Sequence, residues 1–235
     1  MLTSDIQQLG TQDLDMQQAE MRLAEIVSSE TTDEAFDDVE DNFTEWCLQI
    51  NPQRLAFAVG ETWSRKTLER LLGGRRACRR IKSDLIDRYG ALDFTAEPVS
   101  ASHVASLTRL CGVMFNAAHL LKTLDGRTLR AVREMLGDAV ASKSTFICNP
   151  FGSGNGHAQP LFSKDIERLP AMLADDGMAV FSVWRDQEVR DGRGGFANLL
   201  SLTLPVGELR KARVLEEHRD VGSAVFNAAT KEIQK

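Results

Sequence analysis

Residues 100–124, SASHVASLTRLCGVMFNAAHLLKTL, decide the fold class of this chain. Apolar residues recur in this stretch at steps of three and four positions, which is the period of one face of an α-helix. The residues that share this face are Val104, Leu107, Leu110, Val113, Met114, Ala117, Leu120, Leu121 and Leu124. Ser100 or Ser102 can cap the first turn through its hydroxyl group. We therefore expect a long helix here, at the centre of a hydrophobic core.

A second helix is expected directly after this central helix. Asp125 is a good N-cap, and the apolar residues after it keep the helical period. They are Leu129, Val132, Met135, Leu136, Ala139 and Val140. Because the connection between the two helices is short, we expect them to pack against each other as a helical hairpin.

Three breaks between helices are expected on the N-terminal side of the central helix. The pair Asn51-Pro52 breaks the chain, because a residue before proline is disfavoured in helical geometry. A helix over residues 61–72 should stop at Gly73-Gly74, and a helix over residues 75–89 should stop at Gly90. Glycine most readily takes the left-handed conformation just past a helix end, and we expect that conformation at both sites.

The C-terminal side of the chain is also expected to be largely helical. Pro170 suits the first turn of a helix whose apolar residues continue to Trp184. The polar stretch RDQEVRDGRGG at residues 185–195 is expected to form a loop. Residues 196–204 form an apolar run that is too short for its period to distinguish a buried strand from a buried helix. Residues 207–233 return to a helical mixture of charged and small apolar residues.

Charge is unevenly distributed along the chain. The whole sequence has a formal net charge of −6, but residues 1–45 contain thirteen Asp and Glu against one basic residue, Arg22, a net charge of −12. Residues 46–235 therefore carry +6. A segment as acidic as residues 1–45 buries too little apolar surface to offset the entropy of ordering it, so we expect a mobile acidic arm. A loosely amphipathic stretch of the arm, from Leu14 to Ile26, could dock on a partner.

These patterns together predict a mainly α, irregular helical protein in four parts. We expect the arm at residues 1–45, an N-terminal and central helical portion at 46–149, a Gly/Pro-rich connection at 150–162 and a C-terminal helical portion at 163–235. No apolar run reaches the length of about 20 residues that a membrane-spanning helix needs, and the N-terminus lacks the pattern of a signal peptide. We therefore expect a cytoplasmic protein whose four widely spaced cysteines are reduced and buried.

The stretch CNPFGSGNGHAQP at residues 148–160 is the candidate for small-molecule binding. Gly152, Gly154 and Gly156 alternate with small polar residues, but the spacing is not that of a dinucleotide-binding loop, and the lysine of a P-loop is absent. We therefore interpret the stretch as a flexible connection. The histidines lie far apart in sequence, at His103, His119, His157 and His218. No catalytic, cofactor-binding or metal-ligating set is predicted.

Four arginines are the candidate binding residues of the chain. They lie within two turns of one predicted helix and are Arg75, Arg76, Arg79 and Arg80. Such a cluster can be a solvated helix face, can bind an acidic protein surface or the chain's own acidic arm, or can bind the phosphates of a nucleic acid. No aromatic residues that could stack on bases lie nearby, so a nucleic acid is the least supported partner. A solvated helix face and a contact with acidic protein groups both stay open. The contact with acidic groups makes these arginines the predicted partner-binding residues.

The order of the expected elements is similar to that of a known family. SLTRLCGVMFNAAHLLKTLDGRTLRAVREMLGDAV, a Pro/Gly-rich break, RLPAMLADDGMAVFSVW and a late LLSLTLP resemble the central and C-terminal pattern of the SctK family, which includes the YscK and PscK proteins of bacterial type III secretion. The stretch INPQRLAFA, followed by Trp63 and a helical pair, resembles the family's N-terminal portion. The resemblance covers roughly residues 48–205. The acidic extension before Phe43 departs from the family's pattern.

The resemblance implies a function in protein secretion. SctK proteins are accessory proteins of the cytosolic sorting platform and link the cytosolic domain of the inner-membrane ring protein SctD to the pod protein SctQ. On this basis we expect a non-enzymatic adaptor without cofactors, located in the cytoplasm at the cytosolic face of the inner membrane. Two alternatives are a chaperone for a secreted effector and, with less support, a nucleotide- or phosphate-binding enzyme that uses the glycine stretch at residues 152–156.

Overall fold

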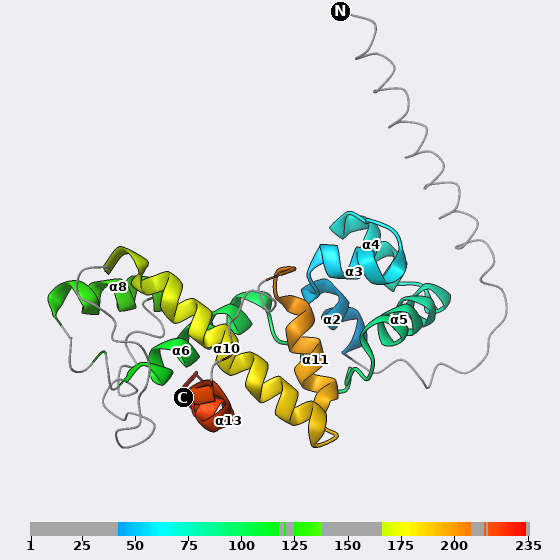
Figure 1. Cartoon of the computed structure of the whole chain (residues 1–235). Helices are drawn as coiled ribbons and strands as arrows, with labels where there is room; N and C mark the ends of the chain where they lie inside the picture. The colour runs from blue at the N-terminus through cyan, green and yellow to red at the C-terminus, as the bar shows by residue number, and fades with distance from the viewer. Residues whose placement is uncertain are drawn as a thin grey trace, which may run out of the picture.

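The structure is a computed structural model that describes residues 42–117, 120, 125–137, 166–207, 214 and 216–233. Every regular element in these residues is helical, with nine α-helices and one 3-10 helix. With the labels of Figure 1 they are α2 (Phe43–Gln49), α3 (Pro52–Val59), α4 (Arg65–Leu72), α5 (Arg75–Tyr89), α6 (Ala101–Phe115), α8 (Gly126–Leu136), η2 (Ile166–Arg168), α10 (Leu169–Arg190), α11 (Gly194–Thr203) and α13 (Glu216–Ile233). The mainly α prediction is confirmed for this part of the chain.

Most of the predicted acidic arm, up to residue 41, and the connection at residues 150–162 with its three glycines lie outside the described residues. The end of the arm was predicted at residue 45, but residues 43–45 belong to α2, and Phe43 is fully buried in the core. Within the described part, no helix combines the length and the apolar character that a membrane crossing requires.

The helices form two groups, which α10 and α11 connect (Figure 1). α6, α8, α10 and α13 make up one group, in which α10 packs on both α6 and α13. α2, α3, α4 and α5 make up the other group, and α11 lies between this group and the end of α10. Buried residues of both groups belong to one hydrophobic core.

Helix boundaries in the second group follow mostly from local rules. α4 begins at Arg65, four residues later than predicted, because the Ser64 hydroxyl accepts a hydrogen bond of 3.1 Å from the Thr67 N–H and caps its start. α5 spans residues 75–89, as predicted, and ends at Gly90, whose φ is 82°. The left-handed conformation expected at Gly73-Gly74 is wrong, since φ is −72° at Gly73 and −104° at Gly74. The chain there makes one more right-handed turn, in which the Gly74 N–H donates to a carbonyl of α4 at 3.0 Å.

α6 begins where the sequence predicts and ends earlier. The Ser100 hydroxyl accepts a hydrogen bond of 3.2 Å from a backbone N–H of the first turn. The apolar period of the sequence continues to Leu124, yet α6 ends at Phe115, so the single uninterrupted helix that was predicted is wrong. The interruption is a turn at Asn116, and Ala117 and Leu120 after it are helical again. Both the backbone N–H of Asn116, at 3.2 Å, and its side-chain amide, at 3.0 Å, donate to the Gly112 carbonyl.

α8 is capped as predicted and packs on α6. Oδ1 of Asp125 accepts hydrogen bonds from the backbone N–H groups of Thr128 at 2.7 Å and Arg127 at 3.0 Å. These bonds, above all those from Thr128, hold the pKa of the Asp125 carboxyl below its usual value, because they stabilise its charged form. α8 contacts α6, and the Arg109 guanidinium of α6 donates to the Met135 carbonyl of α8 at 3.5 Å.

The C-terminal half contains more helix than the sequence predicts. α10 extends to Arg190, so the loop predicted for residues 185–195 is wrong over its first part. The charged residues of that part belong to the exposed end of α10. The chain turns at Gly192, with φ of 76°, and Arg193 closes the turn through two hydrogen bonds of 3.1 Å to Glu188. Residues 196–203 are helical and belong to α11, so the apolar run that could be a buried strand or a buried helix is a helix.

α6 and α10 cross at a reciprocal pair of glycines. A Cβ atom on Gly112 of α6 would lie 1.7 Å from the carbonyl oxygen of Leu173 on α10. A Cβ atom on Gly177 of α10 would lie 1.9 Å from the carbonyl oxygen of Thr108 on α6. Both obstacles are helix backbone atoms, which cannot rotate away as a side chain can. The two helices are therefore in backbone contact, and only glycine fits at either position.

α13 completes the first group by packing on both α6 and α10. Trp184 of α10 stacks on Phe226 of α13 with ring centroids 3.9 Å apart, and Phe181 meets the same ring at 5.7 Å. A third glycine permits this approach, because a Cβ atom on Gly222 would lie 3.0 Å from the Val183 side chain. Aromatic pairs of this kind add about 0.5–1.5 kcal/mol to the effect of area burial.

A buried polar cluster connects the same three helices. Asp176 of α10 accepts a hydrogen bond of 2.8 Å from the Asn116 side chain, and its other carboxylate oxygen lies 3.2 Å from Nε2 of His218 on α13. The His218 ring stacks on Phe115 of α6 with ring centroids 4.3 Å apart. Asn116 and His218 are each 1% exposed, so the carboxylate serves two polar groups that water does not reach.

Hydrogen bonds across the two groups hold α3 against α11. The Asn51 N–H donates to the Leu202 carbonyl at 2.9 Å, and Nε of Arg54 donates to the Leu204 carbonyl at 2.9 Å. α3 also contacts α5. The placement of α5 relative to the core therefore depends on how α3 docks on the end of α11.

Replacing Gly177 by alanine is expected to lower the free energy of unfolding by about 2 kcal/mol or more, because the added methyl group must push α6 and α10 apart. Gly126→Ala is the matched control, since a Cβ atom there meets nothing within 4 Å. An alanine in a helix is ordinarily favoured over glycine by about 0.5–1 kcal/mol, so the control should be unchanged or slightly more stable. Urea unfolding of both variants measures the difference, and a fully stable Gly177→Ala protein would contradict backbone contact at the crossing.

Replacing Asp176 by alanine is expected to cost about 2 kcal/mol of stability, because the buried side chains of Asn116 and His218 lose a hydrogen-bond acceptor. Asp175→Ala removes the neighbouring carboxylate, which is exposed, and should change stability by less than about 0.5 kcal/mol. Thermal unfolding of the two variants side by side tests this difference. Equal effects would mean that the cluster contributes no more than a surface charge.

Candidate functional site

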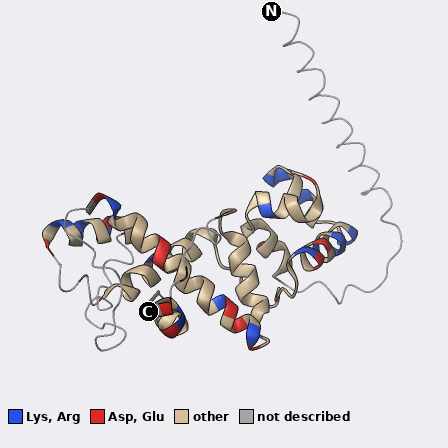
Figure 2. Cartoon of the chain, viewed as in Figure 1, with Lys and Arg blue, Asp and Glu red and all other residues tan. Residues whose placement is uncertain are grey.

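The four arginines predicted to bind a partner all lie on the exposed side of α5. They are Arg75, Arg76, Arg79 and Arg80, and we call them the arginine surface. The opposite side of the helix is buried in the core and carries Ala77, Cys78, Ile81 and Leu85. Figure 2 shows that basic residues gather on α4 and α5. The structure therefore brings the predicted residues together on one accessible face.

α4 and α5 concentrate the positive charge of the chain. Residues 65–89 contain nine Lys and Arg and three Asp and Glu, a net charge of +6. The remainder of residues 46–235 contains equal numbers of acidic and basic residues. The positive excess outside the N-terminal segment therefore belongs to these two helices. Their surface attracts acidic groups by long-range electrostatics.

Arg80 of the arginine surface makes two ion pairs. Its guanidinium lies 3.6 Å from Glu61 and 3.8 Å from Asp84. The Arg80 side chain is 51% exposed, and ion pairs in such surroundings contribute about 0–1 kcal/mol to stability. The two ion pairs of Arg80 therefore add little to the stability of the fold.

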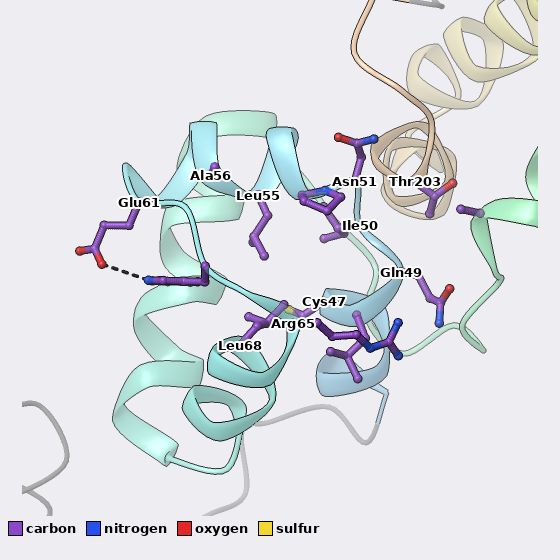
Figure 3. A pocket seen from close by; sticks show the side chains of 14 residues that line it. Cys47, Gln49, Ile50, Asn51, Leu55, Ala56, Glu61, Arg65, Leu68 and Thr203 are labelled. Carbon is purple, nitrogen blue, oxygen red and sulfur yellow. Dashed lines mark hydrogen bonds between the residues drawn. The ribbon is translucent and has the colours of Figure 1, made fainter. Parts of the chain in front are cut away.

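A pocket of about 360 Å³ lies next to the arginine surface, among α2, α3 and α4 (Figure 3). Its apolar wall includes Ile50, Leu55, Trp63 and Leu68. Its lining also includes two exposed charged residues, Glu61 and Arg65. The volume is at the lower end of the range for ligand pockets, and the apolar wall suits one large apolar side chain of a binding partner.

Glu61 connects the pocket to the arginine surface. One of its carboxylate oxygens accepts a hydrogen bond of 3.1 Å from Nε1 of Trp63, which lines the pocket. The other oxygen lies 3.6 Å from the Arg80 guanidinium. The pocket and the arginine surface are therefore adjacent parts of one candidate site, and a segment that carries an apolar residue close to acidic residues would fit both. We call the two together the α4–α5 site.

Sequence reasoning identified the arginines and missed the pocket. The pocket is built from α2, α3 and α4 together with Ala101 and Thr203, which are far apart in the chain. The one signal in the sequence that could have pointed to the pocket was Trp63, a tryptophan between two charged residues, Glu61 and Arg65.

The cysteine of the pocket and the histidines of the described residues lie in different surroundings. Cys47 lines the pocket, but burial, reinforced by the nearby Cys78, raises the pKa of its thiol well above the usual value, so the thiol is protonated and a poor nucleophile. In the described residues no group of three or more His, Cys, Asp or Glu side chains is arranged to hold a metal ion. His103 is exposed and His218 is buried against Asp176, whereas His119 and His157 lie outside the described residues.

Comparisons with protein-family models, curated proteins and solved structures find no match to this chain.

The buried thiols are expected to be unreactive in the folded protein. Cys47, Cys78 and Cys111 are buried, and burial raises the pKa of Cys111 as it does that of Cys47. Cys148 lies outside the described residues, so the test uses a Cys148→Ser variant. We expect a thiol-specific disulfide reagent at pH 8 to label none of the three until guanidinium unfolds the protein. Rapid labelling of one thiol under native conditions would show that its surroundings open.

Proposed function

We propose that the protein is a non-enzymatic adaptor whose α4–α5 site binds an acidic segment of another protein. The observation that carries the proposal is the confinement of a +6 charge to residues 65–89, next to an apolar pocket. An acidic partner gains from this charge at long range and from the pocket at contact. A nucleic acid is disfavoured as the partner, because binding to single strands relies on aromatic rings that stack on bases. The aromatic residue of the site, Trp63, is half-buried, and its ring N–H donates to Glu61.

The specific role that we propose is in bacterial type III secretion. The adaptor would link the cytosolic domain of the inner-membrane ring protein SctD to the pod protein SctQ, in the cytoplasm at the cytosolic face of the inner membrane. Support for this role comes from the resemblance of residues 48–205 to the SctK family, and the helical order of that stretch is consistent with it.

A direct experiment separates this proposal from its alternatives. The full-length protein is mixed with the cytosolic domain of the ring protein and with the pod protein, and capture of each is measured separately and together. An adaptor binds both at the same time. A stable dimer that binds an effector, but neither platform protein, would instead identify a chaperone. Thermal stabilisation by nucleotides would favour the enzyme alternative.

Charge reversal should locate the partner-binding surface. Arg76→Glu/Arg79→Glu is expected to slow association with one of the two platform proteins at low salt by about tenfold or more, because steering depends on the local charge. Arg130→Glu/Arg133→Glu on α8 is the matched control, with the same spacing, charge change and exposure. Stopped-flow association rates at several salt concentrations provide the measurement. Unchanged rates for the first variant would place the contact elsewhere.

A further inference from the structure

The chain contains an acidic segment whose charge is opposite to that of the arginine surface. Residues 30–41, ETTDEAFDDVED, contain seven Asp and Glu and no Lys or Arg, a net charge of −7. Residues 65–89 carry +6, and the rest of residues 46–235 is neutral in sum. Residues 30–41 therefore hold more than half of the −12 charge of residues 1–45, and their charge is similar in size to that of residues 65–89.

We infer that residues 30–41 bind the arginine surface of the same chain and occupy it when no partner is present. This inference concerns the N-terminal segment and so goes beyond the proposed adaptor function.

The attachment point of the segment allows this contact. Asn42, the first described residue, donates through its side-chain amide to the carbonyls of Thr95 at 3.1 Å and Ala96 at 3.2 Å. These two residues belong to the loop that follows α5, so the acidic segment ends near the C-terminal end of that helix. Twelve extended residues reach about 40 Å, whereas the fifteen residues of α5 extend over about 22 Å. The segment can therefore reach Arg75 at the far end of α5.

Covalent connection favours this occupant over a separate acidic protein. A segment tethered close to its site has an effective concentration in the millimolar range, so even a weak contact is populated. The contact requires no fixed fold of the segment, because charge attraction does not depend on one geometry. It should be sensitive to salt, since the Debye length falls from about 8 Å at 0.15 M to about 3 Å at 1 M.

The contact has a regulatory consequence that rests on the proposed function. An acidic partner must displace residues 30–41 before it can bind the arginine surface. Neutralising four of the seven carboxylates, in an Asp33→Asn/Glu34→Gln/Asp37→Asn/Asp38→Asn variant, should therefore increase the rate of partner association. An unchanged rate would contradict this competition.

The inference itself is tested without any partner. A water-soluble carbodiimide joins a carboxylate to a lysine amine that it touches, and α4 and α5 carry Lys66 and Lys82 next to the arginines. Full-length protein is treated at low salt and the products are mapped by mass spectrometry. We expect cross-links from residues 30–41 to these two lysines, and none to the exposed Lys231 on α13. The cross-links should disappear in 1 M NaCl.

Two controls decide what the cross-links mean. Arg76→Glu/Arg79→Glu should abolish them, and the α8 variant Arg130→Glu/Arg133→Glu should retain them, with circular dichroism confirming that both variants fold.

A mixture of 15N-labelled and unlabelled protein shows whether each link lies within one molecule. Links between molecules would mean that a second copy is the occupant. Links that reach Lys231 equally, or that persist in 1 M NaCl, would show an unspecific contact. Any of these three results would overturn the inference, whether or not the platform proteins bind.

Discussion

Two glycines allow α6 and α10 to touch at the backbone, and most of the described fold is arranged around that contact. Gly112 and Gly177 each face a carbonyl oxygen of the opposite helix, so the approach is limited by main-chain atoms on both sides. Close approach aligns the neighbouring turns as well. Asn116 and Asp176 then lie within hydrogen-bonding distance, and α13 can place His218 against the same carboxylate. The polar cluster is thus a consequence of the crossing, and it restricts which register of the three helices satisfies every buried group.

The α4–α5 site lies in the other group of helices and depends on other interactions than the glycine crossing. α3 is held by hydrogen bonds to the end of α11, and α5 rests on the core through a narrow apolar face that includes Ile81 and Leu85. The rest of the α5 surface is available for charge, because Arg side chains that remain in water have little effect on stability. Fold and recognition therefore depend on separate residues of the same helix.

Local signals in the sequence were sufficient for some elements and not for others. α5 could be predicted to the residue, because a glycine precedes it, a glycine follows it and its apolar residues keep one period. The interruption of the central helix at Asn116 could not be predicted, since the apolar period continues through it and the side chain of Asn116 finds its partner, Asp176, on a helix distant in sequence. The charged end of α10 resembled a loop, because polar composition does not distinguish a solvated helix from a turn. The arginines of the site were predicted from one segment, whereas the pocket required several segments to come together.

The distribution of charge also limits how the protein can recognise a partner. Nine basic residues on two short helices repel one another, and that repulsion is tolerated only where solvent or opposite charge screens it. A partner with a few acidic residues gains little specificity from such a surface, because many acidic sequences satisfy it equally. The adjoining pocket adds a requirement of shape, since a large apolar side chain must be presented at the right distance from the acidic residues. Under the proposed function, charge governs the rate of encounter and the pocket governs which sequence stays bound. An acidic segment of the same chain on the arginine surface would raise the affinity that a partner needs, because only a partner that also fills the pocket gains enough to displace the segment.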